Sequence, residues 1–195
     1  MRYRDITGIR KLYFTPRDVA EALNISYASA QVSCSRYVKS NILLRLKRNF
    51  YALGERWNTL SYQETFLIAN ILEIPSYISL TSALSFYEIT TQIQRDFFES
   101  ISLKRTKDIN LREKTFVFKK IGRNLYGGFK RINGYFMATP EKALLDAAYL
   151  TSINRYNIDI DALDIGKINK KNIKKYISIY PDITLKFWRK YVGSL

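Results

Sequence analysis

The chain has 195 residues, of which 47% are hydrophobic and 25% are charged, and its 32 Lys and Arg residues against 17 Asp and Glu give a formal net charge of +15. A single cysteine and the absence of histidine exclude an intramolecular disulfide, a Cys/His zinc cluster and a Ser-His-Asp triad. The basic excess is concentrated in the two ends of the chain, which favours a polyanionic partner such as nucleic acid.

The sequence shows no sign of a secretory signal or a membrane span. Its N-terminus, Met1 to Asp5, is charged and is not followed by an apolar segment. The longest uncharged stretch, residues 74–87, is interrupted by Pro75 and is shorter than the ~18 apolar residues that a span needs. We therefore expect a cytoplasmic protein that does not enter a membrane.

Residues 14–23 have the pattern of a short amphipathic helix. Thr15 and Pro16 form a typical helix start, because Pro loses a donor that is unpaired at this position anyway. Asp18 lies in the first turn, where the helix dipole favours an anion. The apolar residues that follow recur at helical spacing, so we expect this helix to bury one face.

A second helix is predicted from Ser26, a good N-cap, through Lys39. Its apolar face consists of Ala30, Cys34, Tyr37 and Val38. We expect Cys34 to be a buried core thiol. The opposite face carries small polar residues and ends in two cations, a composition that suits contact with a DNA groove better than plain solvent exposure.

A basic hairpin follows the second helix. Residues 42–46 and 50–53 are strand-like and are joined by Lys47, Arg48 and Asn49, of which Asn tolerates the left-handed backbone of a tight turn. Two helices followed by such a hairpin is the order of a winged helix-turn-helix. We predict that residues 1–57 form this DNA-binding domain.

Residues 58–195 predict a second domain of mixed composition. Helices are expected over residues 61–72, which begin with a Ser61 and Glu64 capping box, and over 80–88, 140–150, 169–180 and 183–192. Strands are expected over residues 97–103, 115–120, 126–132 and 135–138, with Asn133-Gly134 as a hairpin turn. The predicted fold class is α+β: an N-terminal winged helix-turn-helix, then a mixed α/β domain with an antiparallel sheet and a helical tail.

The candidate DNA-binding residues lie on the second helix and the hairpin. The first two turns of a helix in the major groove face base edges, whereas later cations contact phosphates. Gln31 can pair with adenine through two hydrogen bonds, and Val32 or Ala28 can contact a thymine methyl group. The candidates are Tyr27, Ala28, Ser29, Gln31, Val32, Ser35, Arg36, Lys39, Arg45, Lys47 and Arg48.

Enzymatic alternatives have weaker support. A nuclease site needs two carboxylates and a lysine around a divalent metal ion, and the carboxylates could come from four residues of the β-rich middle, Asp96, Glu99, Asp108 and Glu113, but no spacing enforces it. Gly127-Gly128 lacks the rest of a phosphate-binding loop. We expect Asp146, on an apolar helix, to make a structural hydrogen bond or ion pair. The chain is thus predicted to be no enzyme and to hold neither a metal nor a cofactor.

Several segments resemble the AbiEi-type antitoxins. Residues 14–23, 26–30 and 44–53 look like that family's N-terminal winged-helix domain, whereas Leu80-Thr-Ser-Ala-Leu84 and Ala138-Thr-Pro-Glu-Lys-Ala-Leu-Leu-Asp146 are similar to motifs of its C-terminal domain. The sequence departs from the family at Asn41 and Asn49, where Gly is frequent. Asn is the next most tolerant residue there, so the turns should persist.

The resemblance implies a transcriptional autorepressor that is also the antitoxin of a nucleotidyltransferase-like toxin, possibly in phage defence. Its partners would be double-stranded operator DNA and the toxin. An alternative is an antitoxin that acts mainly by binding its toxin directly, with DNA binding secondary. The oligomeric state, the operator sequence and the role of the basic tail do not follow from the sequence.

Overall fold

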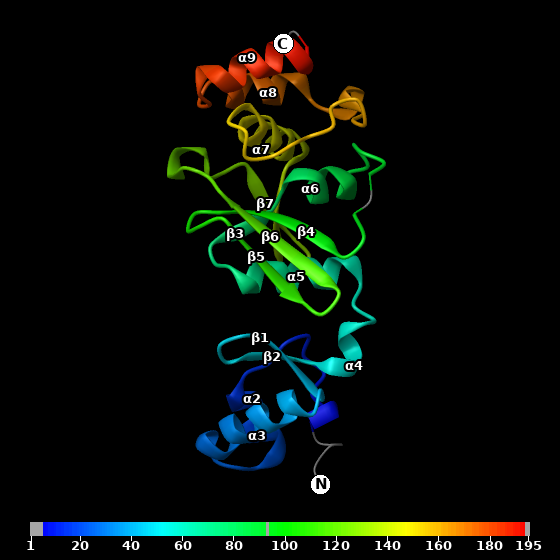
Figure 1. The fold of residues 1–195 in the computed structure, drawn as a ribbon, viewed down its shortest axis with the longest axis vertical. Helices are drawn as coiled ribbons and strands as arrows, with labels where there is room; N and C mark the ends of the chain where they lie inside the picture. The colour runs from blue at the N-terminus through cyan, green and yellow to red at the C-terminus, as the bar shows by residue number, and fades with distance from the viewer. Residues whose placement is uncertain (1–5, 93, 194–195) are drawn as a thin grey trace. The chain divides into compact units, whose positions relative to one another are not determined.

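The computed structural model describes residues 6–92 and 94–193 of the chain (Figure 1). The chain forms two compact units, Met1–Ile68 and Ala69–Leu195. We call them the N-terminal and the C-terminal unit. The domain boundary that the sequence predicts between residues 57 and 58 stays a prediction.

The N-terminal unit contains a pair of helices followed by a two-stranded hairpin. Its elements are α2 (Pro16–Leu23), α3 (Tyr27–Lys39), β1 (Leu43–Lys47), β2 (Phe50–Leu53) and α4 (Gly54–Trp57). Both predicted helices and both predicted strands are present, with ends that differ by at most two residues from the prediction. This order of helices and strands fits a winged helix-turn-helix.

The first predicted helix begins later than expected, at Pro16. Phe14 instead pairs with Tyr51 of β2, because each backbone N–H donates to the other residue's carbonyl oxygen at 2.9 Å. The helix start is held by Asp18, whose carboxylate accepts hydrogen bonds from the backbone N–H and the hydroxyl of Thr15, both at 2.7 Å.

Asn residues occupy the sharp turns of the N-terminal unit. Asn24 ends α2 with φ 50°, Asn41 follows α3 with φ 58°, and Asn49 closes the hairpin with φ 63°. These angles lie in the left-handed region, which Asn tolerates better than other side chains do. The expectation that Asn replaces Gly at positions 41 and 49 without loss of the turns is confirmed.

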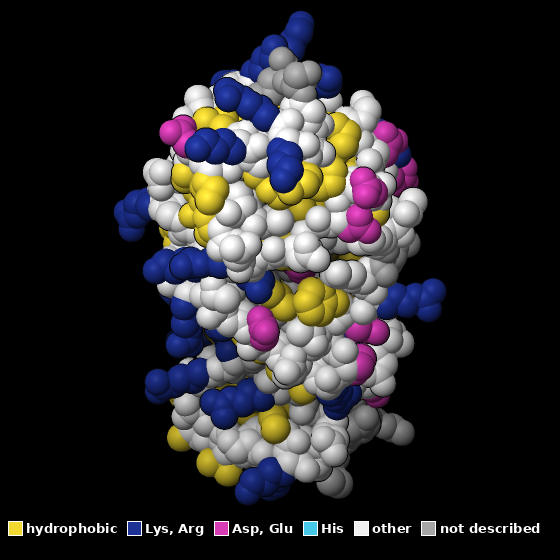
Figure 2. Space-filling model, turned by 45° about the horizontal axis from the view of Figure 1, so that its top comes forward, with side chains coloured by type: hydrophobic (Ala, Val, Ile, Leu, Met, Phe, Trp, Pro, Cys, Tyr) yellow, Lys and Arg dark blue, Asp and Glu magenta, His cyan; other side chains and the backbone are white. Residues whose placement is uncertain are grey.

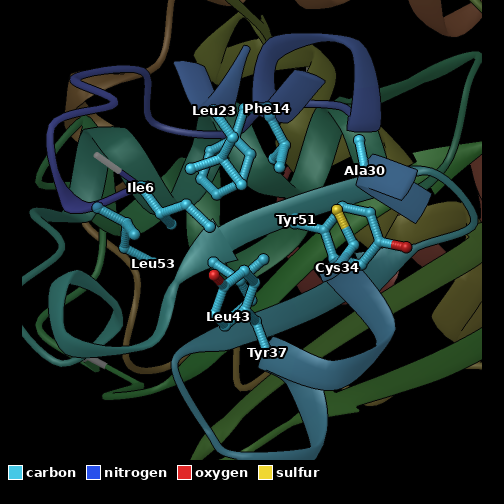
Figure 3. Packing of buried hydrophobic residues seen from close by; sticks show 10 residues of the cluster. Ile6, Phe14, Leu23, Ala30, Cys34, Tyr37, Leu43, Tyr51 and Leu53 are labelled. Carbon is cyan, nitrogen blue, oxygen red and sulfur yellow. The ribbon is translucent and has the colours of Figure 1, made fainter. Parts of the chain in front are cut away.

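The core of the N-terminal unit is formed by apolar side chains from both helices and both strands (Figure 3). Cys34 is fully buried among them, as the sequence predicts, and burial raises the pKa of its thiol to about 11. The cluster consists of Ile6, Phe14, Val19, Leu23, Ala30, Cys34, Tyr37, Leu43, Tyr51 and Leu53. The inward faces of α2 and α3 are therefore anchored, and their other faces point outward.

A six-stranded sheet forms the centre of the C-terminal unit. Its strands are β3 (Ser76–Ile78), β4 (Phe97–Ser102), β5 (Lys107–Leu111), β6 (Lys114–Lys120), β7 (Phe129–Ile132) and β8 (Tyr135–Ala138), in the order β5-β6-β4-β3-β8-β7. The prediction of an antiparallel sheet is wrong. The sheet is mixed, because β4 runs parallel to β6 and β3 runs parallel to β8.

Two of these strands were absent from the prediction for physical reasons. β5 carries Lys107 and Asp108 and alternates between partly buried and exposed positions at the sheet edge, so it lacks an apolar run. β3 has three residues and precedes Ser79 and α6 directly. The strand predicted from residue 126 begins at Phe129, after Gly128 with φ 70°.

Helices complete the C-terminal unit (Figure 1). α6 (Leu80–Phe86) and α7 (Pro140–Ser152) pack on each other, and α8 (Lys170–Ile177) and α9 (Asp182–Tyr191) pack on α7. α7 therefore lies between the sheet and the last two helices, α8 and α9. α5 (Tyr62–Leu72) spans the boundary between the two units and starts with the predicted capping box, in which Ser61 and Glu64 bond each other's backbone N–H. No helix within the described residues is long and apolar enough to cross a bilayer.

A buried polar network lies between the sheet and α7. The Asp146 carboxylate accepts hydrogen bonds from the hydroxyls of Tyr77 at 2.9 Å and Ser79 at 2.8 Å, and from the Lys142 ammonium. The Lys142 ammonium also donates to Tyr180 at 2.8 Å. Burial and the Asp146 charge raise the pKa of Tyr77 and of Tyr180 well above the ordinary value, so both stay protonated. The predicted structural role of Asp146 is confirmed.

Candidate nucleic-acid interface

Helix α3 is fixed in place at its start and along one face. The Ser26 hydroxyl accepts a hydrogen bond from the Ser29 backbone N–H at 3.2 Å and so satisfies one of the free donors of the first turn. Ala30, Cys34 and Tyr37 are buried in the core described above. Because the helix is held along this face, the orientation of its outer face is determined.

The outer face of α3 carries the eight candidate residues that the sequence placed on this helix. All of them are exposed: Tyr27, Ala28, Ser29, Gln31, Val32, Ser35, Arg36 and Lys39. No Asp or Glu occurs within α3. The structure thus brings these candidates together on one surface, which we call the α3 face.

Two apolar side chains stand out on the α3 face. Val32 is 69% exposed and Tyr27 is 47% exposed, although both are of types that usually pack inside a protein. Neither belongs to the core cluster of the unit. Apolar groups at these places can contact the methyl group of a thymine, whereas they gain nothing from water.

The two serines of the α3 face are already engaged in the helix. The Ser29 hydroxyl accepts a hydrogen bond from the Ser26 hydroxyl at 2.9 Å. The Ser35 hydroxyl donates to the backbone carbonyl of Gln31 at 3.1 Å. Each hydroxyl oxygen keeps a further lone pair, so both serines can still accept a hydrogen bond from a ligand.

The cations of the candidate site extend from the end of α3 to the hairpin. The Arg36 guanidinium lies 5.6 Å from the centre of the Tyr37 ring, and the Lys47 ammonium lies 4.6 Å from that of Phe50. Such contacts with ring faces restrict the side chains while leaving their charge in place. Arg45 and Arg48 are exposed on the hairpin, and Lys47 is partly buried.

The N-terminal unit has exposed cations beyond the candidate residues, and one of them lies at the start of α2. Arg17 lies in the first turn of α2 and is exposed, next to Asp18, which is bonded by Lys11. Burial alone would raise the pKa of Asp18, but hydrogen bonds from Lys11 and Thr15 lower it. Asp18 thus remains ionised and holds Lys11, whereas Arg17 adds positive charge at the start of α2. The sequence signal for this cation is the motif Thr-Pro-Arg-Asp, which also predicts the helix start.

Two of the four carboxylates of the nuclease alternative share a partner, because the Lys114 ammonium forms ion pairs with Asp96 at 2.8 Å and with Glu113 at 3.3 Å. Glu99 is 2% exposed and accepts a hydrogen bond from Tyr156 at 3.0 Å. Asp108 and Glu113 are exposed. Within residues 6–92 and 94–193, no group of three or more His, Cys, Asp or Glu residues could hold a metal ion.

An outward-facing polar helix beside a basic hairpin, in an α+β protein, is an arrangement found in DNA-binding regulators. Residues 1–54 match a family model described as "Transcriptional regulator, AbiEi antitoxin". This stretch contains α2, α3 and the hairpin, and the match confirms the predicted resemblance to AbiEi-type antitoxins. No curated protein matches the sequence significantly.

The fold is similar to that in the crystal structure of the RV2827C protein from Mycobacterium tuberculosis. The TM-score is 0.62 at 10% sequence identity, and the alignment covers 97% of this chain and 74% of the other. At this identity the similarity concerns the fold alone. It extends beyond the segment that the family model matches and includes the C-terminal unit.

Proposed function

We propose that this protein is a sequence-specific DNA-binding transcriptional autorepressor whose α3 lies in the major groove of its operator. The observation that carries the proposal is the α3 face, where exposed small, amide and apolar side chains precede two cations on a helix with no acidic residue. In this proposal the N-terminal unit is a winged helix-turn-helix, and β1 and β2 form its wing.

Base contacts come from the first two turns of α3. Gln31 supplies a donor and an acceptor that match the N7 and N6 edge of adenine. Val32 is the most exposed of the large apolar side chains of the chain's described part and contacts a thymine methyl group. Tyr27, Ala28 and Ser29 lie one turn earlier and contact neighbouring bases.

Phosphate contacts come from the flanking cations. Arg36 and Lys39 end α3, and Arg45 and Arg48 are exposed on the hairpin. Lys47 joins them in the wing. These side chains position the protein on the duplex without distinguishing sequences, because every base pair offers the same phosphates.

The proposed biological role is that of an antitoxin to a nucleotidyltransferase-like toxin, with a place in phage defence. The support is the family description, in which the regulator is named as an antitoxin. Direct binding of the toxin by this chain is the second candidate, since 141 of the 195 residues lie outside the matched segment, residues 1–54. The partner's coding sequence should lie next to that of this protein.

Mobility-shift titrations with the full chain and the DNA upstream of its own coding sequence test the DNA-binding proposal. We expect log K to fall with log salt by ~0.9 per neutralised phosphate. Gln31→Ala should reduce the discrimination between operator and random DNA by about 1–3 kcal/mol. Arg48→Ala should weaken binding to both DNAs alike and lower the salt slope by about one phosphate.

A matched control is Lys175→Ala, which removes an exposed cation of α8 in the C-terminal unit. It should leave the titrations unchanged. If Gln31→Ala and Arg48→Ala had no more effect than this control, α3 and the hairpin would not be the DNA-binding surface.

A further inference from the structure

The last helix of the chain has two apolar faces, of which only one is buried. Thr184 and Trp188 are buried on the inner face, where the Thr184 hydroxyl lies 3.1 Å from the hydroxyl of Ser152 at the end of α7. The outer face carries Ile183, Phe187 and Tyr191 at intervals of four residues. Ile183 is 49% exposed and Tyr191 is 51% exposed.

Two lysines alternate with these apolar residues. Lys186 and Lys190 are exposed and lie three residues after Ile183 and Phe187, so they share the outer face of α9. The Lys190 ammonium lies 4.8 Å from the centre of the Tyr191 ring, and the Phe187 and Tyr191 ring centres are 4.9 Å apart. The outer face of α9 is therefore an ordered stripe of apolar groups flanked by positive charge.

This stripe forms one wall of a hollow of about 530 Å³. Ile158 and Ile160 contribute apolar groups from the segment after α7, and Asn154 and Asn157 contribute exposed amides. The residues that line the hollow within the described chain include two lysines and no carboxylate. Figure 2 shows hydrophobic side chains lying between those of Lys and Arg over the C-terminal helices, toward the top of the view.

We propose that this hollow, which we call the α9 groove, binds an acidic amphipathic helix of another protein. A helix presents apolar side chains at intervals of three and four residues, which matches the spacing of Ile183, Phe187 and Tyr191. Carboxylates beside those anchors would face Lys186 and Lys190. The stripe spans about 12 Å along α9, enough for two turns of a partner helix.

A protein segment suits the α9 groove better than a nucleic acid strand does. The two aromatic rings of the groove, Phe187 and Tyr191, contact each other at a tilt of 42°. The rest of its apolar lining is formed by isoleucines, which provide no flat surface for a base and pack well against aliphatic side chains. Half-exposed apolar groups that gather beside positive charge are typical of interaction surfaces. The inference concerns the C-terminal unit and is independent of the proposed DNA contacts of α3.

Fluorescence anisotropy with the full chain and a designed peptide tests the α9 groove. The probe is a labelled peptide of about 14 residues with Leu at helical intervals of three and four and Glu at the flanking positions. We expect saturable binding that weakens with added salt. A peptide with the same composition in scrambled order should bind at least about tenfold more weakly, since its apolar groups do not share a face.

Two double variants test whether the peptide binds at the α9 groove. The first removes exposed apolar groups and combines Ile183→Ser with Tyr191→Ser. The second reverses the two charges of the groove and combines Lys186→Glu with Lys190→Glu. Each pair should weaken peptide binding by at least about tenfold. The control Lys170→Glu with Lys174→Glu makes the same charge change on α8 and should have less than about a threefold effect.

Three results would overturn the proposal. They are equal binding of the ordered and scrambled peptides, equal weakening by the α8 and α9 charge variants, or binding of a single-stranded oligonucleotide that competes with the peptide at lower concentration. All variants of α8 and α9 should keep the affinity of the wild type for operator DNA. A failure of peptide binding at the α9 groove can therefore be distinguished from a failure of the proposed DNA binding.

Discussion

The two units of the protein place their polar side chains in opposite ways. The core of the N-terminal unit is apolar, and its polar and basic side chains lie outward on α3 and the hairpin. The C-terminal unit buries a charged lysine, a charged aspartate and several hydroxyls between its sheet and α7. A polar residue in the first unit is therefore available to a partner, whereas many in the second serve internal packing.

This difference determines what a substitution should change. Removal of a polar group from the α3 face should affect binding and leave stability nearly unchanged. Removal of one from the interior of the C-terminal unit should reduce stability, because its buried partners lose their hydrogen bonds. The predictions below test this contrast in order of expected size.

The largest effect should come from Asp146→Ala. The buried Lys142 ammonium would lose its counter-charge, and the hydroxyls of Tyr77 and Ser79 would lose their acceptor. We expect a loss of about 3–5 kcal/mol in the free energy of unfolding, measured by urea denaturation. As a control, the double variant Lys142→Met with Asp146→Leu should be more stable than Asp146→Ala, because it leaves no buried charge unpaired. A loss of less than about 1 kcal/mol in the free energy of unfolding of Asp146→Ala would contradict the role of the ion pair.

The second-largest effect should be on the pH dependence of the free energy of unfolding, through the carboxyl group of Glu99. Burial raises the pKa of this carboxyl group from 4.5 to about 7, although hydrogen bonds from Tyr156 and Thr81 oppose the shift. The folded state therefore holds a proton that the unfolded state releases, so this stabilisation is complete below about pH 4 and is lost as the pH rises through about 7.

Between pH 4 and pH 8 the free energy of unfolding should fall by about 3 kcal/mol through Glu99 alone. Glu99→Gln removes the titrating group and should remove this part of the pH dependence, with urea denaturation at several pH values as the measurement. A variant with the unchanged wild-type slope would show that folding does not raise the pKa of Glu99.

A smaller effect is expected in the core of the N-terminal unit. Cys34→Ser places a hydroxyl among apolar side chains and should cost about 1–3 kcal/mol of unfolding free energy. In the wild type, the buried thiol with its raised pKa should react with a thiol reagent only after unfolding. Cys34→Ala with Ser35→Cys moves the thiol to an exposed position and should react at once; equal rates for both proteins would contradict the burial.

The smallest effect should come from the α3 face. Val32→Ala truncates a side chain that is 69% exposed and should change the free energy of unfolding by less than about 0.5 kcal/mol. Ala30→Val, on the buried face of the same helix, should cost about 1–3 kcal/mol by overpacking. A larger loss for Val32→Ala than for Ala30→Val would reverse the assignment of the two faces.

The sequence predicted the N-terminal unit more closely than the C-terminal unit, and the contrast between them explains why. Signals such as Thr15-Pro16, the Ser26 cap and Asn49 are local, and they determine the ends of short elements directly. In the C-terminal unit, β5 has no apolar run, and the parallel pairing of β3 with β8 depends on residues far apart in the chain.

The sequence predicts which face of α3 forms the candidate site. It does not predict the hydrogen bonds and ring contacts that the side chains of the site make within the protein. The period of Ala30, Cys34 and Tyr37 places the remaining side chains of α3 outward. That Ser35 donates to a helix carbonyl and that Lys47 packs on Phe50 depends on rotamers, which no spacing specifies. The sequence predicts a structural role for Asp146, but its partners come from three separate segments: Tyr77 and Ser79, Lys142, and Tyr180, whose hydroxyl donates to it at 3.3 Å.

The order of strands in the sheet also determines the order in which parts of the chain can fold. In the N-terminal unit β1 and β2 are neighbours in the chain, but β3 can complete its parallel pairing only after β4, β5, β6 and β7 have been made and β8 has been added. Pairings between distant segments form slowly, and chains fold from the N-terminus during synthesis. We therefore expect the helix pair and hairpin to be complete on the ribosome while β3 still lacks its parallel partner β8.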